Sequence, residues 1–67
     1  MNLNFKNMDI IKKVIRWMKK ENISMKNMTL YRDGLMDNWV HVKQDNDEYT
    51  IIWKGHGRYT VINMSNL

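Results

Sequence analysis

The residues of this chain best suited to acid–base chemistry near neutral pH are its two histidines, His41 and His56. An imidazole can take or release a proton there because its ordinary pKa is about 6.5. Either histidine, with Lys54 and Arg58 around a phosphate, could support the chemistry of a small ribonuclease. Catalysis also needs a nucleophile or an orienting partner, and the sequence has no recognisable Ser, His and Asp arrangement. We therefore expect a protein that is not an enzyme and has no catalytic residue.

Three carboxylates lie close together in the chain, at Asp45, Asp47 and Glu48. Hard divalent cations prefer such oxygen ligands. The spacing lacks the later glycine and glutamate of a twelve-residue calcium loop, and the chain has no cysteine that could bind a metal as a thiolate. A solvated hairpin tip explains these residues better. We expect no metal site and no cofactor.

A stronger candidate for a binding surface combines basic residues with an aromatic ring. Lys43, Lys54 and Arg58 are expected at one end of a sheet face, with Trp39 beside them. Single-stranded nucleic acid needs such charge for its phosphates and such a ring for base stacking, although the paired aromatic and glycine signature of RNA-binding sheets is absent. In the alternative reading, Trp39 packs under a loop or against a second subunit. The expected binding surface on this outer sheet face comprises Trp39, His41, Lys43, Ile52, Lys54 and Arg58.

Regular elements must position these residues, and the first is a helix over Met8 to Glu21. Its apolar residues repeat at i, i+3, i+4 and i+7, as in an amphipathic helix: Ile11, Val14, Ile15 and Met18. Asn7 is the expected N-cap and Asn22 the expected left-handed stop. At about 100° per residue, the basic residues fall within an arc of roughly 120°. They form a secondary basic surface of Lys12, Lys13, Arg16, Lys19 and Lys20.

After the helix, the pattern changes to the β-branched and aromatic runs that are typical of strands. The expected strands are 28–32, 39–43, 49–54 and 58–63. The polar stretch between the second and third strands, and the glycines between the third and fourth, predict hairpin turns. The sequence thus predicts an α+β fold, with one N-terminal amphipathic helix packed on a three- to four-stranded antiparallel β-meander.

The last hairpin also predicts a register. If its loop has the three residues 55–57, Lys54 faces Arg58, and the pairs that follow are Trp53 with Tyr59 and Ile51 with Val61. Side chains alternate between the two faces of a strand, so one face should be covered by the helix and form the core. That face should carry Tyr49, Ile51, Trp53, Tyr59, Val61, Val40 and Val42.

Length and composition limit the architecture and the partners. With 67 residues we expect one small domain, 1–67, which could gain stability from a homodimer. Lys and Arg total 11 against 7 acidic residues, and the formal charge of +4 favours acidic partners. The chain has neither the run of about 20 apolar residues needed to cross a bilayer nor a secretory signal pattern, so a cytoplasmic location without a membrane partner is expected.

Without a catalytic group, stoichiometric binding is the expected function. The small size and the Asn- and Lys-rich composition resemble the accessory proteins of phages and mobile elements, including inhibitors of host defence. The resemblance implies a non-enzymatic protein that regulates or inhibits a protein target, as a monomer or as a homodimer through the outer sheet face or an edge strand. Two alternatives stay open: a basic nucleic-acid-binding module that uses the outer sheet face, and a homo-oligomer that holds a small anionic ligand, such as a nucleotide, between its subunits.

Overall fold

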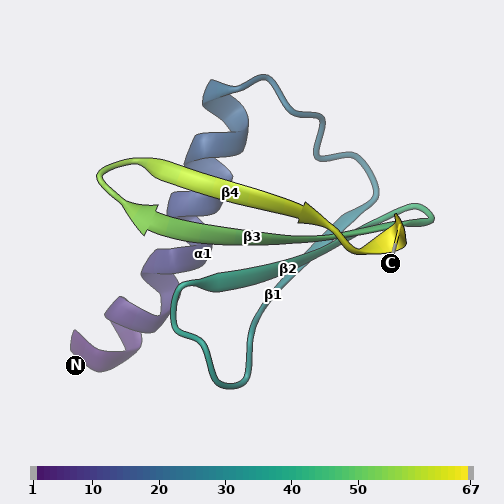
Figure 1. Ribbon diagram of the computed structural model, residues 1–67. Coiled ribbons are helices and arrows are strands. Elements are labelled where there is room, and N and C mark those ends of the chain that lie inside the picture. The colour runs from purple at the N-terminus through teal and green to yellow at the C-terminus, as the bar shows by residue number, and fades with distance from the viewer. Residues whose placement is uncertain (1, 67) are drawn as a thin grey trace.

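The computed structural model describes the backbone of residues 2–66 and the side chains of residues 10–65. One helix, α1 (Asn2–Lys20), lies on one face of a four-stranded sheet, as Figure 1 shows. The strands are β1 (Met28–Arg32), β2 (Trp39–Gln44), β3 (Asp47–Gly55) and β4 (Arg58–Asn63), and a short 3-10 helix, η1 (Met64–Asn66), follows them. Each strand pairs antiparallel with the next, in the order β1-β2-β3-β4. This arrangement confirms the predicted α+β fold, with a helix on a meander of four strands.

The apolar side of α1 is buried against the sheet. Ile10, Val14 and Met18 are 6%, 0% and 2% exposed, and their spacing of four residues sets them on one side of the helix. Burying this side is what fixes the helix in place, because apolar burial is the dominant favourable contribution to folding. Within residues 2–66, no helix is long and apolar enough to span a membrane.

The two ends of α1 differ in how well they were predicted. At the C-terminal end, Asn22 has a φ of 59°, its N–H donates to the Lys19 carbonyl, and the Ile23 N–H donates to the Met18 carbonyl. These two bonds and the left-handed residue form a Schellman motif, which confirms the predicted stop. At the other end, the helix begins at Asn2, so the prediction of Asn7 as the N-cap is wrong. Residues 2–6 contain neither proline nor glycine, so nothing in the chain ends the helix at Asn7.

The core lies between α1 and the helix-facing side of the sheet. Val40, Val42 and Ile51 are at most 2% exposed, and half-buried Tyr49, Trp53 and Tyr59 pack around them, as predicted. Val61 is the exception at 48% exposed, although it pairs with Ile51 on the same side. The reason is the position of α1, which packs mainly on β1, β2 and β3 and contacts β4 at Tyr59, so Val61 further along this edge strand stays uncovered.

The β3–β4 hairpin has the predicted register over most of its length. Trp53 pairs with Tyr59 and Ile51 with Val61. Next to the turn, however, Gly55 and not Lys54 pairs with Arg58, and Lys54 is the extra residue of a register shift. The turn consists of two residues with positive φ, His56 at 55° and Gly57 at 72°, as a mirror-image type I′ turn requires. Because the turn is shorter than predicted, Gly55 joins the strand and the predicted pairing of Lys54 with Arg58 is wrong.

Candidate functional site

The outer sheet face is the side of the sheet turned away from α1. Cross-strand pairing sets Trp39 opposite Ile52, His41 opposite Thr50 and Lys43 opposite Glu48. Side-chain alternation therefore brings the predicted residues Trp39, His41, Lys43 and Ile52 onto this face. Two further predicted residues, Lys54 and Arg58, are exposed near the β3–β4 turn.

The basic residues of the outer sheet face do not converge. The partner of Lys43 is Glu48, six residues before Lys54 along β3, which corresponds to about 20 Å at about 3.3 Å per residue. Lys43 therefore lies at the opposite end of the sheet from Lys54 and Arg58, contrary to the predicted grouping at one end. Its ammonium group is 3.7 Å from the Glu48 carboxylate, and both side chains are more than half exposed. The predicted antiparallel order already implies this separation, because Lys43 lies near the end of β2 and Lys54 near the end of β3, and paired antiparallel strands end at opposite ends of a sheet.

The middle of the outer sheet face is covered by rings. The Tyr31 and His41 ring centroids are 5.3 Å apart, and those of Trp39 and His41 are 6.4 Å apart in an edge contact. Trp39 is half-buried, and Ile52 opposite it is only 9% exposed. Ile52 is therefore part of the packed layer, whereas Trp39 keeps some surface for contact.

His41 is held by side chains from two neighbouring segments. Its Nε2–H donates to Asp33 Oδ1 at 2.6 Å, since an ionised carboxylate can only accept. Its Nδ1 is 3.0 Å from Thr50 Oγ1 and accepts the hydroxyl proton when the ring is neutral. The bond from His41 and those from the backbone N–H groups of Met36 and Leu35 lower the pKa of Asp33 from its ordinary 3.8 to about 2. Asp33 therefore stays ionised and fixes the orientation of the imidazole at neutral pH.

The row of Asp33, His41 and Thr50 has the order of an orienting acid, a base and a hydroxyl. Thr50 is 2% exposed, so its hydroxyl is closed off from any substrate outside the sheet. The row joins the end of β1 to β2 and β3 and braces the loop that begins at Asp33. The sequence does not predict this contact, because the approach of Asp33 to His41 follows from the pairing of Tyr31 with His41.

The acidic cluster lies at the β2–β3 hairpin, as predicted. Asp45 has a φ of 53° in the turn and accepts a hydrogen bond from Asn27 Nδ2 at 3.1 Å. Glu48 pairs with Lys43, and the Tyr49 hydroxyl is 3.5 Å from Asp47. Among the described residues, no three His, Asp or Glu side chains come together in a group that could hold a metal ion. These carboxylates serve the hairpin and its neighbouring loop.

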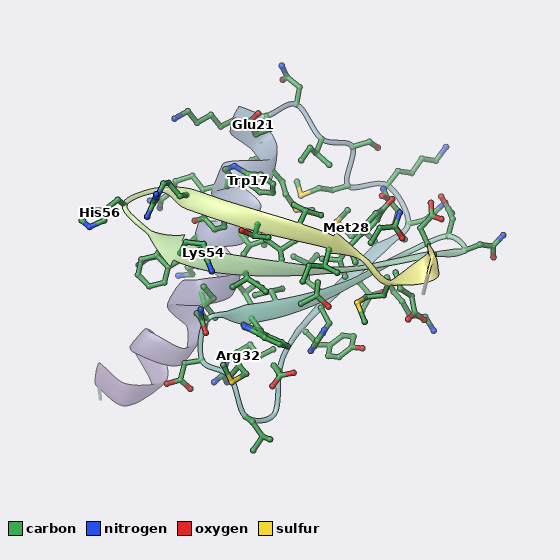
Figure 2. All side chains as sticks on the ribbon, viewed as in Figure 1. Trp17, Glu21, Met28, Arg32, Lys54 and His56 are labelled. Carbon is green, nitrogen blue, oxygen red and sulfur yellow. The ribbon has the colours of Figure 1, made fainter. Side chains whose placement is uncertain are left out.

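A second candidate site lies between α1 and the β3–β4 hairpin, and we call it the helix–hairpin pocket. Its volume is about 270 Å³, and its lining residues are Lys13, Arg16, Trp17, Lys20, Trp53, Gly57 and Tyr59. Figure 2 shows Trp17 on α1 and the hairpin, with His56 at its tip, across from it. The predicted secondary basic surface thus spans two hollows, because Lys12 and Lys19 line a different one with Ile15, and Arg16 borders both.

Contacts between its walls hold the helix–hairpin pocket in shape. Trp17 and Tyr59 are stacked, with ring centroids 4.9 Å apart and planes at 27°. The Tyr59 hydroxyl donates to the Lys13 carbonyl at 3.2 Å, which ties β4 to the middle of α1. The Lys13 ammonium lies 3.6 Å from the centroid of the Trp53 ring, at cation–π distance. Two walls that are far apart in the sequence therefore form one rigid unit.

The sequence does not predict this pocket, because its strand pattern places Trp53 and Tyr59 on the core face. A signal was present in the helix pattern, since Lys13 and Trp17 are four residues apart and so only about 40° apart around the helix axis. Trp17 thus borders the basic arc as well as the apolar side. Which strand it would meet depended on the position of α1 across the sheet.

Comparison of the chain with protein-family models, curated proteins and solved structures finds no match.

Proposed function

We propose that the protein acts by stoichiometric binding and regulates or inhibits a protein target that docks on the loop between β1 and β2. The observation that carries this proposal is Leu35, which is 91% exposed. A leucine in water contributes almost none of the burial energy that its side chain offers, whereas burial against a partner would release about 1.5–3 kcal/mol. Met36 and Tyr31, 43% and 52% exposed, add apolar surface close by in the chain. Exposed apolar surface of this kind favours contact with another protein.

The loop is also fixed before any partner arrives. Asp33 Oδ2 accepts hydrogen bonds from the N–H groups of Leu35 and Met36, both at 2.9 Å. At the far end, Asn38 exchanges two bonds with Trp53: its carbonyl accepts from the Trp53 N–H, and its Nδ2 donates to the Trp53 carbonyl, each at 2.9 Å. A loop that is already ordered loses little conformational entropy on binding. This supports Leu35 as the anchor of an interface.

Capture with a tagged chain, followed by affinity measurement with the purified partner, tests the proposal. Leu35→Ser should weaken binding of the captured partner about 10- to 100-fold, because it removes an apolar anchor of about 1.5–3 kcal/mol. The matched control is Val61→Ser, which removes an exposed apolar side chain on β4 and should change binding less than twofold. A partner retained equally by all three chains would contradict docking at the loop, as would capture of no partner by the unaltered chain.

A further inference from the structure

The helix–hairpin pocket is not needed by the protein-docking proposal and has a chemistry of its own. Three half-buried rings line it, those of Trp17, Trp53 and Tyr59, so each ring keeps part of its surface toward the pocket. An aromatic surface in a concave site stacks with a flat ring. Any of the nucleobases can stack on an aromatic side chain in this way, because each has a planar π-face. The rings thus favour a ligand with a planar aromatic part.

The charge of the pocket favours an anion. Its lining holds three cations, Lys13, Arg16 and Lys20, and no carboxylate. Lys13 is engaged with the Trp53 ring, whereas Arg16 and Lys20 are exposed and have no carboxylate partner among residues 10–65. Guanidinium and ammonium groups are the usual phosphate ligands of proteins. A ligand that neutralised these cations would also relieve their mutual repulsion.

We propose that the helix–hairpin pocket binds one nucleotide, with the base against the rings and the phosphate at Arg16 and Lys20. The volume of about 270 Å³ lies just below the usual range for small-ligand sites, about 300–1,000 Å³, so a dinucleotide cannot be held entirely inside. The turn residue Gly57 has no side chain to narrow the opening. The nucleotide can come from two sources that share this chemistry: a free mononucleotide, or one unit of a single-stranded nucleic acid that runs across the site. Either source binds within one chain and needs no second subunit.

Titration of the full chain with adenosine monophosphate, a ten-nucleotide single-stranded oligoadenylate and inorganic phosphate tests this proposal. The titrations are done at about 50 mM salt, where phosphate contacts are strong. The reporting signal is tryptophan fluorescence, because a stacked base quenches an indole. Trp39 lies on the outer sheet face, so in Trp39→Phe the remaining tryptophans, Trp17 and Trp53, both line the pocket. Quenching should persist in this variant.

Two double variants with the same charge change separate the pocket from the rest of the basic helix. Arg16→Ala with Lys20→Ala removes the two proposed phosphate ligands, and Lys12→Ala with Lys19→Ala removes two cations outside the pocket. Each pair lowers the formal charge from +4 by two, to +2. The first should bind the nucleotide probes about 5- to 30-fold more weakly, and the second within twofold of the unaltered chain. Circular dichroism checks that both remain folded.

Weaker nucleotide binding in the Arg16 and Lys20 double variant alone supports the proposal. If adenosine monophosphate then competes with the oligonucleotide, a free nucleotide is sufficient as the ligand. If the same double variant loses binding and only the oligonucleotide binds the unaltered chain, the site takes its nucleotide from a single-stranded nucleic acid. Equal losses in both pairs, loss of quenching in Trp39→Phe, inorganic phosphate binding as tightly as the nucleotide, or no binding of any probe overturns the proposal.

Discussion

The same substitution of valine by alanine should lower the free energy of unfolding by different amounts at two positions on the helix-facing side of the sheet. Val40→Ala, at a residue 0% exposed, removes two methyl groups from the core, or about 1.6 kcal/mol at about 0.8 kcal/mol each. The cavity left behind raises the loss to about 2–3 kcal/mol. Val61→Ala removes the same groups from a residue 48% exposed, so we expect about half the transfer energy and no cavity, or about 1 kcal/mol. Both residues are in strands, so the difference in β-propensity cancels.

Urea unfolding, followed by far-ultraviolet circular dichroism and tryptophan fluorescence, measures both losses. At a slope of about 1 kcal/mol per molar urea, Val40→Ala should lower the midpoint by about 2 M or more and Val61→Ala by about 1 M. A chain of this length has a total stability of about 3–10 kcal/mol, so the first loss is a large part of it. Equal losses, or a larger loss for Val61→Ala, would refute the placement of α1 over β1 to β3. Repeating the measurement at several protein concentrations shows whether a second copy covers β4.

Two further predictions concern the loops. Because the pKa of Asp33 is lowered from 3.8 to about 2, the bonds of its carboxylate stabilise the fold above pH 3.8, and this stability is lost as the pH falls toward about 2. Asp33→Asn should therefore show a smaller drop in unfolding midpoint than the unaltered chain between pH 4 and pH 2, and equal drops would count against the bond to His41. Gly57→Ala should cost about 1 kcal/mol, because Gly57 has a φ of 72°, whereas Gly34→Ala at a residue without positive φ should be neutral or slightly stabilising. Thermal unfolding compares the two, and an equal effect would contradict the turn geometry.

The features that could be predicted from the sequence depend on neighbours in the chain. The stop at Asn22 follows from a short polar residue at the end of an apolar period, and the pairing of Trp53 with Tyr59 follows from glycines between two strands. The errors occurred where local chemistry allows two answers. Nothing local separates a helix that begins at Asn7 from one that begins at Asn2, and a loop with two glycines can close with two residues or three. A difference of one residue there moved Lys54 out of its predicted pair.

By itself, the sequence determined the order of the helix and the strands, the side of α1 that is buried and the residues that share each sheet face, because these depend on periods of 3.6 and 2 residues. Only the tertiary structure decided which side chains meet. The bond between Asp33 and His41 requires the β1–β2 register, and the stack of Trp17 on Tyr59 requires the particular crossing of α1 over the sheet. That crossing is set by how the buried residues of the two layers fit together, and the periods of 3.6 and 2 residues alone do not predict it. The basic arc of α1 thus became the wall of an aromatic pocket only when the helix met the β3–β4 hairpin.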